Sequence, residues 1–492
     1  ADLDGVLIAP RLNNIEVGIF THPTAEASVL NLAHAQQMKT LKLQDIQSNL
    51  IIENVQKITS FGISGYNGST LELDASGKNI SSTLKMAFAD SLNLVVDVER
   101  PGHKPPSVLD VTLTSSQVYL HNDVDAAAIH LHSNGSGQNG FGLYPTGDYG
   151  NVHALTIDGA GDLNLSLMVV YDNLHVYDAS KATGALDTSI GGKQLTKVLG
   201  GAGNDSLYLE GLGGTKHHKA SVKLGDGDDV VNLAEGVPDN RRHEVFGGSG
   251  HDTAIIEGAV KRFSGMFHGF EGFYVYHPSD DYNLAGTGFV DIRLMNAADG
   301  VTLNHVASSA TVSLFESQQG GLEIDVAGAK NATTDSLSLS LYGGLAIGGL
   351  EEGLEVAGLS NLTIYSYGNE NVLYLDSAGT AADPLTISIG GDTGLTLANT
   401  AGVYSFISHL TITNTAGVDI SGLGIGAEQA FLPGGATITG GAGNDVLIGG
   451  NGDDTINTGG GNNTVHISRG IDHINLGFNT GTDVLLFSAD MF

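Results

Sequence analysis

The chain has 492 residues, with 54 acidic residues against 21 Lys and Arg, no cysteine, and a formal net charge of −33. This acidic balance excludes a surface built for nucleic acid or anionic membrane, because a protein that binds phosphates needs clustered basic residues. The absence of cysteine excludes a disulfide scaffold and fits an exported bacterial surface protein that is stabilised by ions. The sequence also lacks the run of about eighteen apolar residues that a transmembrane helix needs.

Short strand-like runs begin near the N-terminus and recur along the chain. "TLKLQDI" from Thr40 and "DVTLTSS" from Asp110 alternate apolar and polar residues, as half-buried strands do. The stretch 25–39 is the one segment with helical potential, although strand-like runs flank it. Later runs, such as "HALTIDGAG" from His153 and "SNLTIYSYG" from Ser360, recur with a loose period of roughly 18 to 25 residues. The pattern predicts an all-β chain of elongated β-solenoid or β-sandwich modules, in which each coil needs neighbours to bury its apolar side.

A first group of glycine-rich nonapeptides lies near the middle of the chain. "GGAGNDSLY", "LGDGDDVVN" and "GGSGHDTAI" match, fully or with one weak position, the pattern GGxGxDxUx of calcium-binding β-rolls. They start 24 and 23 residues apart, so each coil would carry an enlarged connection on its far edge. We expect Asp205, Asp229 and Asp252 to form one ladder with calcium between its rungs. Three separate turns that do not stack are the alternative.

A second group lies near the end of the chain. "GGAGNDVLI" and "GGNGDDTIN" are full matches, and "TGGGNNTVH" and "ISRGIDHIN" are weaker copies that follow at once. Because two nonapeptides make one coil, motifs eighteen residues apart should stack on the same edge. Asp454 would then face Asp472 on one edge, and Asp445 would face Asn463 on the other. These segments predict parallel β-rolls that bind calcium.

Each nonapeptide supplies the oxygen atoms that calcium prefers. Glycine lets the turn adopt positive φ and brings backbone carbonyls close to an ion, the Asp adds an anionic oxygen, and calcium takes about six to eight such ligands. A flexible glycine-rich linker would not keep Asp at the sixth position and an aliphatic residue at the eighth. The predicted calcium-binding residues are Gly200, Ala202, Gly203, Asp205, Gly225, Asp226, Gly227, Asp229, Gly247, Ser249, Gly250, Asp252, Gly440, Ala442, Gly443, Asp445, Gly449, Asn451, Gly452, Asp454, Asn463 and Asp472.

These features divide the chain into four segments. We expect β-rich modules at 1–198 and 259–432, each followed by a calcium-binding β-roll, at 199–258 and 433–492. Because the sequence opens on Ala1 rather than Met, we expect it to be a processed or excised portion of a longer chain.

The order "GGAGNDSLYL", "LGDGDDVVNL", "VFGGSGHDTAIIEG", then Thr/Ser/Asn-rich strands and the terminal "GGAGNDVLIGGNGDDTI", resembles the RTX-type bacterial surface-layer (S-layer) proteins over roughly residues 150–492. The nonapeptides alone are shared by the wider RTX family, which includes proteases, lipases, toxins, adhesins and polysaccharide epimerases. The long β-rich spacer between two calcium clusters favours the S-layer branch. The helical anchoring domain of some such proteins is not visible in the sequence.

The resemblance implies a protein that leaves the cell unfolded through a type I secretion system and folds when it meets external calcium. It implies an extracellular location on the bacterial surface and self-assembly into a two-dimensional lattice, with several Ca²⁺ ions as cofactors. The partners would be other copies of the chain and, as a second partner, cell-surface polysaccharide. The physical argument agrees at one point, since these acidic residues repel one another until a cation neutralises them.

No catalytic constellation is visible, so we do not expect an enzyme. The sequence contains no HExxH zinc motif and no nucleophile elbow, and without cysteine it cannot use a thiolate. Two alternatives stay open: an RTX adhesin, and a polysaccharide lyase or epimerase on a β-helix. An aromatic-lined binding site is not expected, because the chain has no Trp and only 6% aromatic residues.

A few further residues are weaker candidates for cation sites. His217, His218 and His251 lie near the middle calcium cluster, and His103, His130 and His132 sit close together. We interpret these histidines as solvated loop residues rather than as metal ligands. Asp123 and Asp125, beside His121, form a candidate extra cation site. Asp280, Asp281, Glu351 and Glu352 are candidates for calcium bridges between subunits, since acidic turns are otherwise simply solvated.

The neutral side chain of Asn463 leads to a prediction about the terminal repeats. The edge that contains Asp445 should bind calcium more weakly than the edge that contains Asp454, because one of its rungs carries no charge. Calcium occupancies at the two edges, measured in limiting calcium, test this difference, and equal occupancies would contradict it.

Overall fold

The computed structural model describes most of the chain. The described residues are 7–21, 27–55, 58–66, 70–74, 83–99, 107–122, 126–145, 152–165, 173–213, 219–234, 243–257, 265–276, 281–296, 300–317, 321–327, 335–349, 351–357, 359–380, 382–401, 405–424, 435–467, 469–477 and 481–487. The chain divides into two compact units, Ala1–Thr253 (unit 1) and Ala254–Phe492 (unit 2). The expected four-segment division stays a prediction.

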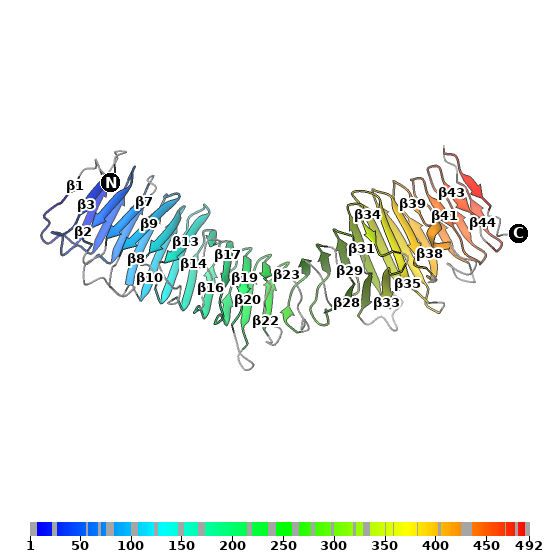
Figure 1. Ribbon diagram of the computed structural model, residues 1–492, viewed down its shortest axis with the longest axis horizontal. Helices are drawn as coiled ribbons and strands as arrows, with labels where there is room; N and C mark the ends of the chain where they lie inside the picture. The colour runs from blue at the N-terminus through cyan, green and yellow to red at the C-terminus, as the bar shows by residue number, and fades with distance from the viewer. Residues whose placement is uncertain are drawn as a thin grey trace. The chain divides into compact units, whose positions relative to one another are not determined.

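Unit 1 is a parallel β-solenoid in which the chain alternates between two sheets (Figure 1). One sheet contains β2 (Val17–Thr21), β4 (Thr40–Gln44), β6 (Ser60–Ser64), β8 (Thr83–Ala89), β10 (Val108–Thr114), β12 (Ala128–Asn134), β14 (Ala154–Gly159), β16 (Val176–Ala182), β18 (Lys197–Leu199), β20 (Ser221–Asp226) and β22 (Glu244–Ser249). The other contains β1 (Leu7–Ile8), β3 (Ser28–Asn31), β5 (Leu50–Glu53), β7 (Thr70–Asp74), β9 (Leu94–Glu99), β11 (Gln117–Asn122), β13 (Asn139–Pro145), β15 (Leu163–Leu165), β17 (Leu186–Gly191), β19 (Ser206–Gly211) and β21 (Val230–Leu233).

Unit 2 repeats this plan. After β23 (Thr253–Glu257) and β24 (Phe267–His268), one sheet contains β25 (Gly272–Tyr276), β27 (Asp291–Leu294), β29 (Ala310–Leu314), β31 (Ser336–Tyr342), β34 (Asn361–Tyr367), β36 (Leu385–Gly391), β38 (Ile407–Ile412), β40 (Thr437–Thr439), β42 (Thr455–Asn457) and β44 (His473–Asn475). The other contains β26 (Asp281–Asn283), β28 (Val301–Val306), β30 (Leu322–Val326), β33 (Leu354–Ala357), β35 (Asn371–Ala378), β37 (Leu395–Asn399), β39 (Val418–Asp419), β41 (Val446–Ile448), β43 (Thr464–His466) and β45 (Val484–Leu486), with β32 (Ala346–Ile347) beside β35. The predicted all-β solenoid with β-roll segments is confirmed.

Aliphatic side chains fill the space between the two sheets. In β10, Leu109 and Val111 are fully buried, whereas Asp110 between them lies on the outer face. Parallel in-register pairing places Leu84 of β8 and Ile129 of β12 on either side of Leu109. Each coil therefore covers the apolar surface of the next, and burial of that surface stabilises the stack by roughly 25 cal/mol per Å².

One corner of unit 1 is held by buried polar side chains. The turn from β10 to β11 contains only Ser115 and Ser116, and Ser116 is fully buried, as are Ser91 and Asn139 in the neighbouring turns. The amide of Ser91 donates to Ser116 Oγ at 3.2 Å, and the amide of Ser116 donates to Asn139 Oδ1 at 2.9 Å. A side-chain oxygen of one coil thus satisfies a buried turn amide of the coil before it, as buried backbone requires.

The stretch 25–39 forms strand and turns rather than a helix. Within it, the described residues form β3 and two turns, and the alternating burial of Ser28 and Leu30 fits a strand whose neighbours are β1 and β5. Tertiary pairing with the flanking strands overrides the local helical propensity. In the described residues, η1 (Ser421–Gly424) is a short 3₁₀ turn, and no helix there has the length and hydropathy to cross a membrane.

Candidate calcium sites

The middle nonapeptides lie at the same corner of unit 1 as the serine turns. They connect β18 to β19, β20 to β21, and β22 to β23. Ser206 pairs with Val230, and Ser221 pairs with Glu244. Each strand therefore lies beside the equivalent strand of the next coil. The prediction that these turns stack is confirmed, and the alternative of separate turns is wrong. Of the predicted enlarged connections, residues 214–218 and 235–242 lie outside the described residues.

The sixth residue of each middle repeat binds the turn before it. The amide of Asp205 donates to Asp229 Oδ1 at 2.8 Å, and the amide of Asp229 donates to Asp252 Oδ1 at 3.0 Å. In its own turn, Asp205 Oδ2 accepts the amide of Gly201 at 2.8 Å. All three carboxylates are at most 1% exposed, so the predicted ladder of Asp side chains exists.

The fifth residue makes a second set of bonds in the opposite direction. Asn204 Oδ1 accepts the amide of Asp228 at 3.0 Å, and Asp228 Oδ1 accepts the amide of His251 at 2.8 Å. Here the acceptor belongs to the earlier coil, whereas in the Asp ladder it belongs to the later coil. The exposed fifth position and the buried sixth position together clamp each pair of adjacent turns.

Glycine is required where the stacked turns touch. Gly225 and Gly227 have φ of 126° and 129°, and a Cβ on either would collide with the carbonyl oxygen of Gly201 or Gly203 in the coil before. Gly248 and Gly250 have equivalent contacts in the next coil. The turns therefore present backbone carbonyls at a spacing that only glycine allows.

The terminal repeats form two such edges in unit 2, as predicted. The amide of Asp454 donates to Asp472 Oδ1 at 3.1 Å, and the amide of Asp445 donates to Asn463 Oδ1 at 2.9 Å. Strand registers offset by one coil, such as Ile438 with Ile456, produce this pairing. Asp454, Asp445 and Asn463 are at most 1% exposed.

Two further turns continue these ladders and were missed in the sequence. Asp483 Oδ1 accepts the amide of Asn463 at 3.0 Å, so the edge of Asp445 ends in a carboxylate. In unit 1, Asp162 Oδ1 accepts the amide of Ala185 at 2.9 Å. Gly161 lies close to the Asn134 carbonyl of the coil before, just as the later turn glycines lie close to carbonyls of their preceding coils. The residues "GTDVL" and "GAGDL" carry part of the pattern, but the first lies after a longer spacing and the second is one residue short.

Burial raises the pKa of the ladder carboxylates. The pKa of Asp205 is raised to about 6 by desolvation, against the amide bonds from Gly201 and Leu186. Desolvation also raises the pKa of Asp229 to about 7, with repulsion from Asp205 and Asp252 adding to it. Desolvation by burial also raises the pKa of Asp445. In each case burial disfavours the charged form, and a bound cation would offset that cost.

Calcium fits this donor set. Asp229 Oδ2 is buried and has no hydrogen-bond partner among the described residues, and the oxygens that accept one amide keep a further lone pair. The other ligands would be turn carbonyls, which calcium accepts readily. No group of three or more His, Asp or Glu side chains in the described residues could hold a metal, so a site here would depend on backbone oxygen with one or two carboxylates. When bound, calcium would supply positive charge between the rungs.

The other predicted calcium-binding residues fall into a buried group and an exposed group. The first glycines of the turns, Gly200, Gly247, Gly440 and Gly449, are buried, as are Gly443 and Gly452 at the fourth position. Third-position side chains are exposed, so only their carbonyls could contact an ion; these residues are Ala202, Asp226, Ser249, Ala442 and Asn451. Ser249 Oγ donates a short hydrogen bond to Asp226 Oδ1.

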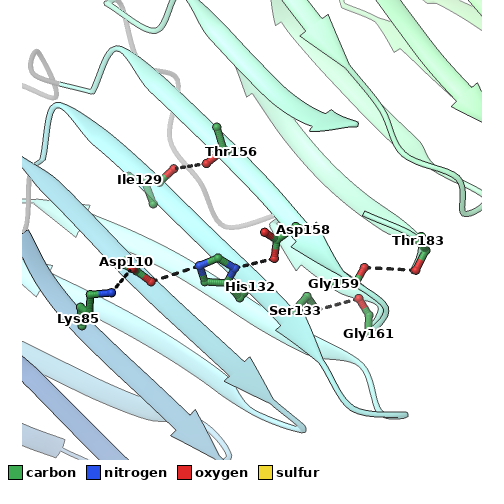
Figure 2. Close-up of polar contacts among 10 residues, drawn as sticks. All are labelled: Lys85, Asp110, Ile129, His132, Ser133, Thr156, Asp158, Gly159, Gly161 and Thr183. Carbon is green, nitrogen blue, oxygen red and sulfur yellow. Dashed lines mark hydrogen bonds and ion pairs between the residues drawn. The ribbon is translucent and has the colours of Figure 1, made fainter. Parts of the chain in front are cut away.

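The interpretation of His130 and His132 as loop residues is wrong, because both lie on strand β12. His132 sits between two carboxylates, with Nε2 3.2 Å from Asp110 Oδ1 and Nδ1 2.6 Å from Asp158 Oδ1 (Figure 2). Lys85 Nζ lies 3.1 Å from Asp110 Oδ2. These side chains form a row of contacts across four neighbouring strands on the outer face of the sheet. The alternation of apolar and polar residues along β12 could have predicted that His132 lies on a strand.

Among the described residues, the remaining weaker candidates form no group of three or more that could hold a metal. His251 is exposed, and His121 lies against Tyr144 with ring centroids 5.0 Å apart. Asp281, Glu351 and Glu352 are exposed, which is compatible with their predicted role as bridges but does not test it. The candidates His103, Asp123, Asp125, His217, His218 and Asp280 lie outside the described residues.

Comparison with known proteins identifies the terminal repeats. Residues 433–465 match the RTX calcium-binding nonapeptide repeat family, whose pattern spans four copies. The chain thus carries RTX repeats on a β-solenoid, and RTX repeats of this kind typically bind Ca²⁺. No curated protein matches the chain.

The stacked turns of the middle nonapeptides give a test of the glycine requirement. Gly227→Ala should destabilise unit 1 by about 1–3 kcal/mol, because a Cβ at positive φ is strained and collides with the Gly203 carbonyl. Thermal and urea unfolding in saturating calcium measure the loss. Gly211→Ala is the matched control, since nothing lies within 4 Å of its Cβ position. Equal stability of the two variants would contradict the requirement.

The raised pKa of Asp229 gives a pH prediction. In calcium-free buffer the folded state keeps this proton up to a pKa of about 7, against 3.8 for the ordinary group. Stability from this residue should therefore be fully present below about pH 4 and be lost as pH rises to about 7. Asp229→Asn should flatten the slope of unfolding free energy against pH, and Asn463 shows that an amide fits such a turn. An unchanged slope in the variant would refute the assignment.

Proposed function

We propose that this protein is a calcium-dependent, self-assembling surface-layer protein that forms a two-dimensional lattice on a bacterial outer surface. RTX repeats suggest a secreted, extracellular protein. The proposal adds to this that calcium completes the fold outside the cell and that the chain has a structural rather than a catalytic role.

The observation that carries the proposal is the exchange of neutral side chains for buried carboxylates at one corner. Ser91, Ser116 and Asn139 satisfy turn amides without charge. Asp205 and Asp229 make the same kind of bond while carrying a charge that burial disfavours. Because the bond alone does not need a carboxylate, the charge supports a role in binding a cation.

Calcium would also control when the chain folds. Without a cation, the ladder carboxylates repel one another across adjacent coils, and the net charge of −33 opposes compaction. Cation binding then contributes to the folding free energy, as in other small metal-dependent folds. A chain with this dependence stays unfolded where calcium is scarce and folds after export.

Acidic groups on the surface support assembly through further calcium. Asp281 at the start of β26, and Glu351 and Glu352 between strands, are exposed in unit 2, where bridges between subunits could neutralise them. The two alternatives predict different behaviour: an adhesin would fold with calcium and stay monomeric, and a lyase or epimerase would also act on uronate polymers.

A calcium titration of the purified chain in chelator-treated buffer tests the proposal. Circular dichroism should show strand signal, light scattering should rise, and electron microscopy should show ordered sheets as calcium is added. Magnesium at the same concentrations is the control, because it demands stricter octahedral geometry and gives up its water reluctantly. Folding without sheets, together with activity on uronate polymers, would replace the proposal with the enzyme alternative.

A further inference from the structure

The outer face of one sheet in unit 2 gathers aromatic side chains from strands far apart in sequence. We call this set the aromatic platform; it consists of Tyr274, Arg293, Phe315, Tyr342, Tyr365 and Tyr367. The residues belong to, or directly follow, β25, β27, β29, β31 and β34, which are neighbours in the sheet. This cluster could not be expected from the sequence, because only the register of the strands brings these residues together.

Four of the platform rings, those of Phe315, Tyr342, Tyr367 and Tyr365, form a chain of nearly parallel contacts. Phe315 and Tyr342 stack with centroids 4.9 Å apart and planes 4° apart, and Tyr342 and Tyr367 stack at 5.2 Å and 22°. Tyr365 lies beside Tyr367 at 6.1 Å and 9°. At the other end, the Arg293 guanidinium lies over the Tyr274 ring, with Cζ 4.4 Å from the centroid.

Tyr365 differs from the other rings because small residues flank it. Its register partners are Ser340 on β31 and Gly390 on β36, whereas Tyr342 pairs with Tyr367. A Cβ on Gly390 would lie 3.0 Å from the Tyr365 ring, so that ring leans over the glycine. Ser340 is buried at 5% exposed, whereas the rings of Tyr365 and Tyr342 are 36% and 39% exposed and reach solvent.

Hydrogen-bonding groups surround the rings. The phenol hydroxyls of Tyr342, Tyr365 and Tyr367 make no hydrogen bond within the described part of the chain. A row of side-chain hydroxyls runs along the same outer face in register, made of Thr311, Ser338, Thr363 and Ser388. Contact with an apolar protein surface would bury these polar groups unpaired, at a cost.

The charges of the platform are nearly balanced. Arg293 binds Asp291 through Nη2 to Oδ2 at 2.9 Å, so its guanidinium is already neutralised. With a net charge of −33 on the chain, a polyanion would be repelled. These features favour an uncharged ligand that has apolar C–H faces and many hydroxyl groups.

We propose that the aromatic platform binds a neutral polysaccharide. The apolar face of a sugar residue would lie on the exposed face of Tyr365 and over the edges of the stacked rings. The sugar hydroxyls would bond to the phenols and to the neighbouring row of hydroxyls. Aromatic rings with a polar tip suit such a contact, because they offer a large rigid surface together with a donor. The site does not depend on lattice assembly.

Affinity electrophoresis of the calcium-loaded full chain tests this site. Gels containing dextran, hydroxyethyl cellulose or laminarin should retard the protein, and cellohexaose or laminarihexaose should give a measurable affinity by titration calorimetry. Tyr342→Ala with Tyr365→Ala should weaken binding at least about tenfold, the loss expected for removing a well-packed aromatic anchor. Tyr342→Phe with Tyr365→Phe should retain affinity to within about threefold, because it keeps the rings.

Tyr119→Ala is the matched control, since Tyr119 is a half-buried tyrosine on β11 in unit 1. Circular dichroism and the calcium midpoint should be the same for all variants, which separates binding from folding. The proposal is overturned by equal migration of wild type and the double alanine variant in every gel, or by an equal loss in Tyr119→Ala. It is also overturned if the alanine variant changes only self-association, which would make the platform a protein contact. Sheet formation is measured separately by electron microscopy. The proposals of lattice assembly and of polysaccharide binding can therefore fail independently.

Discussion

The fold depends on one repeated need: the buried amides at the corner of each coil must find an acceptor in the neighbouring coil. In unit 1, Ser116 and Asn139 meet this need without charge, and Asp229 and Asp252 meet it with a carboxylate. The geometry of the bond is similar in both cases. What changes is the electrostatic cost, since a buried ionised carboxylate is unfavourable unless a cation or a proton offsets it. The corner is thus one scaffold that holds neutral acceptors in some turns and buried carboxylates in the nonapeptide turns.

The same corner explains why the repeats contain so little apolar surface. Between the sheets, one buried aliphatic residue per short strand, such as Leu447 or Ile456, covers the next coil. Longer strands such as β10 bury three residues each. A coil of short strands gains less from burial, so the hydrogen bonds across the turns have to contribute more. The glycines permit this because they let carbonyls and amides of adjacent coils approach closely.

Much of this could be predicted from the sequence, for a physical reason. The nonapeptide spacing is a local pattern, and it correctly placed Asp454 opposite Asp472 and Asp445 opposite Asn463. Contacts that depend on longer and irregular spacings were missed. Asp483 follows Asn463 by 20 residues rather than eighteen, and His132 and Asp158 meet across 26 residues. The aromatic platform needs the register of five strands, which no single segment of sequence contains.

The opposed bonds of the fifth and sixth turn residues give the stack a polarity. In the buried ladder, a side-chain oxygen of each coil accepts an amide of the coil before it. In the exposed ladder, a side-chain oxygen accepts an amide of the coil after it. A coil can thus be complete only when both neighbours are in place, and its order depends on them rather than on the whole molecule. Such a chain behaves as a one-dimensional array with nearest-neighbour coupling. Loss of the bonds at one turn should loosen the two coils that share them and leave distant coils ordered, so that a local defect is felt by its neighbours rather than by the whole solenoid.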